Sequence, residues 1–177
     1  SAIVSSTIPL AAGYAFSNKL KKNKKIVLSF FGDGATEEGV FFETLNFSAL
    51  KKLPIIFICE NNLYATYSNF NSNFKTNNLS EITKTYKCPS KITSTFNYKN
   101  LKSSIISSFH SVKKKGPFFL EVLTYRLGPH VGPETDIDKK YRTKNELNFW
   151  YEPDLVNIYE KNFQSKLKNF KKKIKKK

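Results

Sequence analysis

Short apolar runs alternate along the chain with longer segments in which apolar and polar residues are mixed. The apolar runs cover residues 26–31, 55–59 and 118–125. Their length and composition are typical of buried parallel strands. The longer segments predict helices over residues 8–22, 36–52, 80–87, 99–114 and 143–151, with another after Pro153. Strands that alternate with helices indicate an α/β fold with a doubly wound parallel sheet.

The residue pattern also predicts where the second helix begins, which stretches are loops and which face of the first helix is buried. Thr36 is expected to be the N-cap of the second helix, with Glu37 and Glu38 at the positive end of its dipole. The Asn-rich stretch 69–79 and the stretch 126–142 have no periodicity and are expected to be loops. In the first helix, one face is expected to be buried through Leu10, Ala11, Tyr14, Ala15 and Leu20.

Composition narrows the class of protein. The chain has 177 residues, 40% of them hydrophobic, which is enough for one ordinary domain with its own core. Two cysteines, Cys59 and Cys88, do not make a disulfide scaffold and fit a reducing compartment. No apolar run approaches the roughly 20 residues that a membrane span needs. No signal peptide is recognisable, and methionine is absent even at position 1, so we expect a fragment or a processed chain.

The net charge of +16 raises the question of a polyanionic partner. Residues 161–177 contain nine lysines and no acid, so they contribute +9, and the first 160 residues contribute the remaining +7. Only Arg126 and Arg142 are arginines, although arginine is the better bidentate ligand of phosphates and bases. We therefore expect a solvated lysine-rich tail, and a basic nucleic-acid-binding protein is the less favoured hypothesis.

Polar residues follow each of the three predicted strands, where an open α/β sheet binds its ligands. Gly32-Asp33-Gly34 follows the first strand, Asn61-Asn62 the second, and His130 lies in the loop after the third. Carboxylate and amide oxygens suit Mg²⁺ or Ca²⁺, and Mg²⁺ usually completes its coordination with water and phosphate. Glycines and a helix beginning near Ala35 favour the approach of that phosphate. The pattern predicts a diphosphate–metal site.

Each of these elements has a simpler explanation when it is taken alone. A lone Gly-Asp-Gly is more often a tight turn, and an Asn pair after a strand is usually a turn as well. His130 in a Gly/Pro loop is more often a surface residue, and His110 is expected to be solvated. The combination of Gly-Asp-Gly and Asn-Asn, each after a buried strand, is much less frequent by chance.

The chain resembles the alpha subunit of the thiamine diphosphate-dependent 2-oxo acid dehydrogenases of the pyruvate, branched-chain and acetoin complexes. The segment from GDGATEEG to LPIIFICENNLYA is similar to the thiamine diphosphate motif, which begins with GDG and ends with NN. IPLAAGYAF, FFETLNFSAL, TYRLGPH, the later YR and the W-x-x-x-D segment are similar to the alpha subunit in particular. The resemblance covers about residues 3–155 and implies the thiamine diphosphate-binding fold.

The resemblance implies a role for several residues. Asp33, Asn62 and the backbone carbonyl of Tyr64 would coordinate Mg²⁺, and Gly34 and Ala35 would donate backbone N–H groups to the diphosphate of the cofactor. A second implied set lies on the loop after the third strand. It consists of His130, near the cofactor and the reacting substrate, and Arg126, which would support the diphosphate.

The resemblance also implies the reaction and the partners. The activity would be oxidative decarboxylation of a 2-oxo acid such as pyruvate, with transfer of the acyl group to lipoyl. The alpha subunit would work in an alpha2beta2 heterotetramer with a beta subunit that supplies the glutamate activating the cofactor, and a lipoyl acyltransferase would accept the product. Such enzymes work in the bacterial cytoplasm or an organelle matrix.

Some features depart from the family pattern. Val131 follows His130 where well-known members have a serine, and the HVGPETD loop differs from the pyruvate and branched-chain versions. A non-oxidative thiamine diphosphate enzyme (transketolase-like or a carboligase) and an acetoin dehydrogenase-type subunit are therefore alternatives. We expect the diphosphate-binding domain to cover residues 1–155, with its N-terminal part missing, and a lysine-rich tail to cover 156–177.

Overall fold

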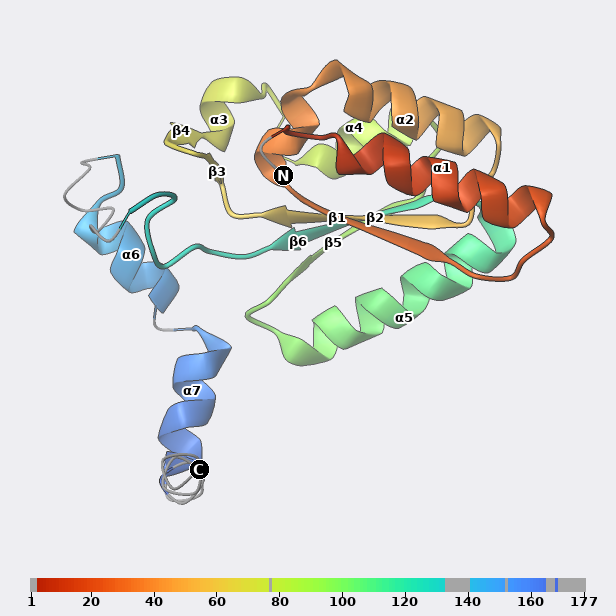
Figure 1. The fold of residues 1–177 in the computed structure, drawn as a ribbon. Helices are drawn as coiled ribbons and strands as arrows, with labels where there is room; N and C mark the ends of the chain where they lie inside the picture. The colour runs from red at the N-terminus through yellow and green to blue at the C-terminus, as the bar shows by residue number, and fades with distance from the viewer. Residues whose placement is uncertain (1–2, 77, 133–140, 152, 165–167, 169–177) are drawn as a thin grey trace. The chain divides into compact units, whose positions relative to one another are not determined.

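A computed structural model describes residues 3–76, 78–132, 141–151, 153–164 and 168 (Figure 1). The chain divides into two compact units, Ser1–Tyr125 and Arg126–Lys177, and each is described here by itself. The expected division of the chain at residue 155 stays a prediction.

A four-stranded parallel sheet forms the centre of the first unit. Its strands are β1 (Val27–Gly32), β2 (Ile55–Asn61), β5 (Ser90–Ser94) and β6 (Phe118–Leu123). They lie in the order β1-β2-β6-β5, and every neighbouring pair is parallel. The predicted fold class, an α/β fold with a parallel sheet, is therefore confirmed.

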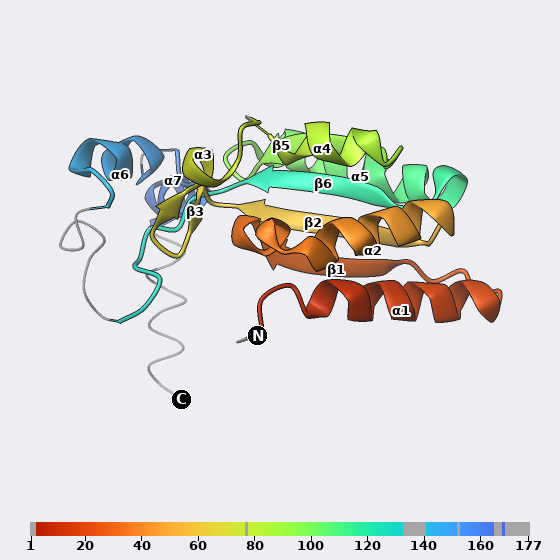
Figure 2. The same cartoon turned by 90° about the horizontal axis from the view of Figure 1, so that it is seen from above.

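Helices cover both faces of this sheet (Figures 1 and 2). One face carries α1 (Thr7–Leu20), α2 (Gly39–Leu50) and α4 (Leu79–Thr85), and the other carries α5 (Tyr98–Lys115). Shorter elements lie in the connections at the carboxyl ends of the strands. These are the 3₁₀ helix η1 (Asp33–Glu37), β3 (Tyr64–Ala65), β4 (Ser68–Asn69) and α3 (Phe70–Asn73).

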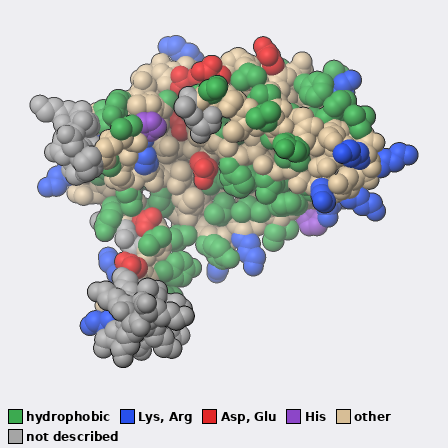
Figure 3. Space-filling view, in the orientation of Figure 1, with side chains coloured by type: hydrophobic (Ala, Val, Ile, Leu, Met, Phe, Trp, Pro, Cys, Tyr) green, Lys and Arg blue, Asp and Glu red, His purple; other side chains and the backbone are tan. Residues whose placement is uncertain are grey.

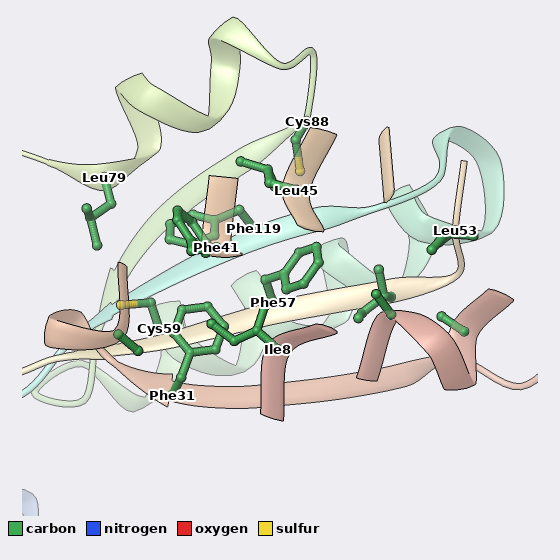
Figure 4. Close-up of a cluster of buried hydrophobic side chains, with 14 of the residues drawn as sticks. Ile8, Phe31, Phe41, Leu45, Leu53, Phe57, Cys59, Leu79, Cys88 and Phe119 are labelled. Atoms are coloured by element: carbon green, nitrogen blue, oxygen red, sulfur yellow. The ribbon is translucent and has the colours of Figure 1, made fainter. Parts of the chain in front are cut away.

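Two hydrophobic clusters, one on each face, hold the layers together. In the larger cluster the rings of Phe31, Phe41 and Phe119 meet between the sheet and α2, with centroids 5.8 Å apart for Phe31–Phe41 and 6.0 Å apart for Phe41–Phe119 (Figure 4). The smaller cluster packs Val112 of α5 against the opposite face of β2 and β6. Burial of these apolar side chains fixes the strands, and with them the loops that follow the strands.

The structure corrects the expected buried face of α1. Leu10, Tyr14 and Leu20 are exposed, whereas the buried residues of the helix are Ile8, Ala12 and Ala15. The small side chains of Ala12 and Ala15 let α1 approach the sheet closely, and Ile8 fills the core beside them. The expectation was wrong for Leu10, Tyr14 and Leu20, whereas Ala15 is buried as expected and Ala11 packs against the core.

Two further differences concern β5 and the start of α2. β5 was not predicted, because its sequence SKITS is mostly polar and the strand lies at the edge of the sheet. Thr36 does not cap α2, which begins at Gly39. The Thr36 hydroxyl instead donates to the carbonyl oxygen of Asp33 at 2.6 Å and closes a turn of η1. Such local bonding of a threonine to the backbone competes with regular helix formation.

The described part of the second unit includes α6 (Lys144–Tyr151) and α7 (Leu155–Asn162), in the segments expected to be helical. The described parts of the predicted loop, residues 126–132 and 141–142, contain no helix or strand. Residues 133–140 of that loop and most of the lysine-rich tail lie outside the described residues. Among the described residues, no helix is long and apolar enough to cross a membrane.

Candidate cofactor and metal site

Asp33 and Asn62 lie together at the carboxyl edge of the sheet. They follow β1 and β2, which are neighbouring parallel strands and end side by side, with Gly32 in register with Glu60. The Asp33 side chain is buried, and its Oδ1 accepts a hydrogen bond from the backbone N–H of Asn62 at 3.3 Å. The two segments meet as the strand pattern predicts, while the identity of what they bind stays a prediction.

The backbone after Asp33 packs closely against the hairpin formed by β3 and β4. A Cβ atom at Gly34 would lie 2.9 Å from the Cβ of Ala65, so a larger residue requires one of the two segments to move. On the other side, the buried Ser5 hydroxyl donates to the carbonyl oxygen of Ala35. The Gly34–Ala35 backbone is therefore held from two sides. It forms η1 and not the first turn of an α-helix, which corrects the expected helix near Ala35.

The turn after β2 is shaped by the side chains of its two asparagines. Asn61 Oδ1 accepts from the N–H of Leu63 at 3.0 Å, and Asn62 Oδ1 accepts from the N–H of Tyr64 at 3.2 Å. Leu63 has a φ of 70°, a left-handed conformation that is unfavourable for a leucine. These bonds hold an otherwise strained turn, in which the Asn62 N–H contacts Asp33 and Tyr64 lies two residues further along the chain.

A buried carboxylate that was not among the expected site residues supports this turn. Glu121, on β6, accepts a hydrogen bond from Asn61 Nδ2 at 2.8 Å through Oε1. Its Oε2 accepts from the N–H groups of Leu79 and Ser80 at 3.0 and 3.2 Å. Burial raises the pKa of the Glu121 carboxyl, and the hydrogen bonds from Asn61, Ser80 and Leu79 oppose that shift. The signal in the sequence was a single acidic residue within the apolar run FFLEVL.

Cys59 lies on β2, buried close to these acidic groups. Burial raises the pKa of its thiol well above the usual value, and the negative charges of Asp33 and Glu121 raise it further. The thiol of the metal-free protein is therefore protonated at neutral pH.

The donor atoms in this region are the carboxylate of Asp33, the amide oxygen of Asn62 and nearby backbone carbonyls. Such hard oxygen donors suit Mg²⁺, with water and phosphate completing its coordination. Among the described residues no group of three or more His, Cys, Asp or Glu side chains is placed to hold a metal ion. The residues therefore fit a magnesium–diphosphate group better than a zinc site.

The second unit contains the other two predicted site residues. His130 is exposed, and Arg126 donates from Nη2 to the hydroxyl of Tyr141 at 2.9 Å. Arg142 donates to the carbonyl oxygen of Arg126, and its guanidinium lies 5.5 Å from the ring centre of Tyr141. These contacts tie the beginning of the loop to its end. That Arg126 and His130 reach the cluster around Asp33 stays a prediction.

Many basic side chains of the first unit lie at the opposite edge of the sheet (Figure 3). Lys19 and Lys113–Lys115 are in the last turns of α1 and α5, and Lys51 follows the end of α2. There they interact favourably with the negative ends of the helix dipoles. In the described part of the first unit, these lysines thus lie away from Asp33 and Asn62.

The profile of the dehydrogenase E1 component family matches residues 1–176. The chain belongs to this family. The resemblance drawn from the motifs around Asp33 and Asn62 is therefore confirmed.

Curated relatives of this E1 chain are named as alpha subunits of two kinds of dehydrogenase. It is 33% identical to the pyruvate dehydrogenase E1 component subunit alpha of Rhizobium meliloti. The alignment spans 146 residues, which is 82% of this chain and 41% of that protein. It is 30% identical over 145 residues to the 2-oxoisovalerate dehydrogenase subunit alpha of Bacillus subtilis, covering 81% of this chain and 43% of that protein. It is also 30% identical to the mitochondrial 2-oxoisovalerate dehydrogenase subunit alpha 1 of Arabidopsis thaliana. That alignment spans 148 residues, which is 83% of this chain and 31% of that protein. This E1 chain thus spans less than half the length of these relatives.

The fold of the E1 chain is also found in a solved structure. A protein from Mycobacterium smegmatis, assigned as a thiamin diphosphate-dependent enzyme, matches with a TM-score of 0.54 and 19% sequence identity. The match covers 70% of this chain and 22% of that one. At this identity the likeness supports the fold alone, and it agrees with the parallel-sheet architecture.

Proposed function

We propose that this chain is part of the alpha subunit of a thiamine diphosphate- and Mg²⁺-dependent 2-oxo acid dehydrogenase. The activity would be oxidative decarboxylation of a pyruvate-like 2-oxo acid with transfer of the acyl group to lipoyl. This is the reaction of an oxidoreductase that acts on an oxo group with a disulfide as acceptor. The observation that carries the proposal is the 3.3 Å contact between the Asn62 N–H and the Asp33 carboxylate, at the end of neighbouring parallel strands.

In this proposal three oxygen donors of the chain hold Mg²⁺. They are the Asp33 carboxylate, the Asn62 side-chain oxygen and the Tyr64 backbone carbonyl. Asn62 Oδ1 already accepts one hydrogen bond from the Tyr64 N–H, and an amide oxygen keeps a second lone pair for the metal. Burial of Asp33 supports this role, because a buried carboxylate gains from a cationic partner.

The Gly34–Ala35 segment would bind the diphosphate through backbone N–H groups. Its close packing against Ala65 supports this, since a segment fixed on both sides presents its N–H groups in one arrangement. A ligand bound by preorganised donors loses less entropy than one bound by a mobile loop.

The loop after β6 would complete the site. Bound thiamine diphosphate supplies the carbanion chemistry that releases CO₂ from a 2-oxo acid. His130 would donate a hydrogen bond to phosphate or move a proton near the substrate, which an imidazole does close to neutral pH. Arg126 would support the diphosphate with its charge, and its bond to Tyr141 restricts its guanidinium.

The proposal includes partners and a location. A beta subunit would complete the site in an alpha2beta2 assembly, and a lipoyl acyltransferase would accept the acyl group. We propose the bacterial cytoplasm or an organelle matrix as the location, supported by the relative named as mitochondrial. The diphosphate-binding domain would extend to residue 155, followed by the lysine-rich tail.

Calorimetric titration with thiamine diphosphate in the presence of Mg²⁺ tests the proposed site. It should be performed on the protein purified with its natural partner subunits. Binding is expected for the unmodified protein and should weaken at least about a hundredfold in Asp33→Ala, because alanine removes the one charged ligand that the chain itself supplies to the metal. Glu60→Gln is the matched control, because Glu60 is an exposed carboxylate one residue before the turn. Equal binding by Asp33→Ala and the unmodified protein would overturn the metal assignment.

The reaction itself is tested with pyruvate and 2-oxoisovalerate in the presence of lipoamide. Reduction of lipoamide is the expected result. Carboligation without reduction of lipoamide would instead support the non-oxidative alternative.

A further inference from the structure

The carboxylate of Glu121 joins two segments that come from different parts of the chain. It is 1% exposed and lies on β6, in register with Cys59 of β2. Asn61, at the end of β2, and the first residues of α4 all donate hydrogen bonds to it. A buried charge is costly unless its oxygens are satisfied, and here both oxygens are.

One oxygen of Glu121 determines the orientation of the Asn61 amide. Because Oε1 accepts from Asn61 Nδ2 at 2.8 Å, Asn61 Oδ1 must point the other way, where it accepts from the Leu63 N–H at 3.0 Å. That bond stabilises the left-handed Leu63, the residue between Asn62 and Tyr64.

We propose that Glu121 is a positioning residue that holds the 61–64 turn in the shape that directs Asn62 and Tyr64 toward Asp33. The inference rests on the proposed function for its consequence in metal binding, but not for its geometry. Glu121 acts through Asn61 and touches no proposed ligand.

The donors around residue 121 require a side chain whose two terminal atoms are both hydrogen-bond acceptors. Asn61 Nδ2 approaches one oxygen, and the Leu79 N–H, the Ser80 N–H and the Ser80 hydroxyl approach the other. A carboxylate is acceptor-only and suits this arrangement. In Glu121→Gln, an NH₂ group must face either Asn61 or the start of α4. If the Asn61 amide turns over to accept from it, its own NH₂ group then faces the Leu63 N–H.

A double variant restores the donor and acceptor pattern. With Asn61→Asp added to Glu121→Gln, the glutamine NH₂ donates to the aspartate, and the glutamine oxygen accepts from Leu79 and Ser80. The other aspartate oxygen still accepts from the Leu63 N–H. The negative charge moves from position 121 to position 61 while the hydrogen-bond network is kept.

Amide hydrogen exchange at Asn62, Leu63 and Tyr64 tests the proposal directly, in the protein purified with its partner subunits. We expect faster exchange at these amides in Glu121→Gln, and recovery in the double variant. Mg²⁺ affinity at saturating thiamine diphosphate should fall about 10- to 100-fold in Glu121→Gln and recover with the turn, as for other residues that orient metal ligands. Glu60→Gln is the control and should change neither measurement.

Two results would overturn the proposal: unchanged exchange at these amides in Glu121→Gln, or a folded double variant in which the turn does not recover. If Glu121→Gln does not fold, the double variant alone decides, since rescue of folding and of the turn requires the pairing proposed here. If the unmodified protein binds neither Mg²⁺ nor thiamine diphosphate, the proposed function is wrong. The hydrogen exchange measurement would still test whether Glu121 positions the turn.

Discussion

The backbone N–H of Asn62 donates to the carboxylate of Asp33 at 3.3 Å, across 29 residues of sequence. This contact exists because β1 and β2 are adjacent and parallel, so that the residues following each strand emerge at the same edge. The other proposed residues of the first unit are placed by the same two strand ends. Gly34 and Ala35 follow Asp33 directly, and Tyr64 lies two residues after Asn62.

We expect Gly34→Ala to impair the site through its contact with the hairpin. The new Cβ would lie 2.9 Å from the Cβ of Ala65, so η1 or the hairpin must move. Overpacking of this kind typically costs about 1–3 kcal/mol of unfolding free energy. Urea unfolding should show this loss, and thiamine diphosphate affinity should fall with it.

Gly13→Ala is the matched control for this change. Gly13 lies in α1, and a Cβ there would have nothing within 4 Å. The change should stabilise the protein by about 0.5–1 kcal/mol, because alanine is the better helix former. An equal loss of stability in both variants would show that the Gly34–Ala65 contact is not the cause.

The core between α2 and the sheet should be sensitive to the size of Leu45. Leu45 is fully buried, so Leu45→Ala is expected to lower the unfolding free energy by about 2–5 kcal/mol through lost burial and a cavity. Leu50, on the same helix, is 73% exposed, and Leu50→Ala should change stability by less than about 0.5 kcal/mol. Similar losses in the two variants in urea unfolding would contradict the assigned buried face of α2.

The three apolar runs that became β1, β2 and β6 could be identified from sequence because all three are dominated by bulky apolar residues. The meeting of Asp33 and Asn62 followed from the parallel arrangement alone. The polar edge strand β5 and the exposure of Leu10, Tyr14 and Leu20 on α1 could not be predicted in the same way. Edge strands need little apolar surface, and which face of α1 is buried depends on how closely the helix approaches the sheet.

The supporting contacts of the site were also beyond pattern analysis. The sequence shows that Glu121 is an acidic residue within an apolar strand, and a buried carboxylate needs hydrogen-bond donors. It does not show that the partners are Asn61 and the start of α4, since these are 60 and about 40 residues away. Likewise, the Ser5 hydroxyl donates to the Ala35 carbonyl oxygen across 30 residues of sequence, a contact that only the folded chain makes.

Stability at alkaline pH should reveal the buried thiol of Cys88. Burial raises the pKa of this thiol from its ordinary value of 9.0 to about 12. Between these values the unfolded chain releases a proton that the folded chain retains, so the folded state loses stability as pH rises. Cys88 should contribute a fall of about 1.4 kcal/mol per pH unit in unfolding free energy across this window, and none well below pH 9.

Comparison with Cys88→Ala isolates this effect, because every other titrating group is common to both proteins. Urea unfolding between pH 8 and pH 10.5 should give curves that converge as pH rises, with the unmodified protein losing stability faster. Parallel curves would contradict a raised thiol pKa at this position.

The most direct test of the proposed site is a crystal structure of the protein, purified with its partner subunits, with Mg²⁺ and thiamine diphosphate bound. The metal is predicted to lie about 2.1 Å from an Asp33 carboxylate oxygen, Asn62 Oδ1 and the Tyr64 carbonyl oxygen. The backbone N–H groups of Gly34 and Ala35 should face the diphosphate. A metal ion and diphosphate bound away from Asp33 and Asn62 would contradict the central claim.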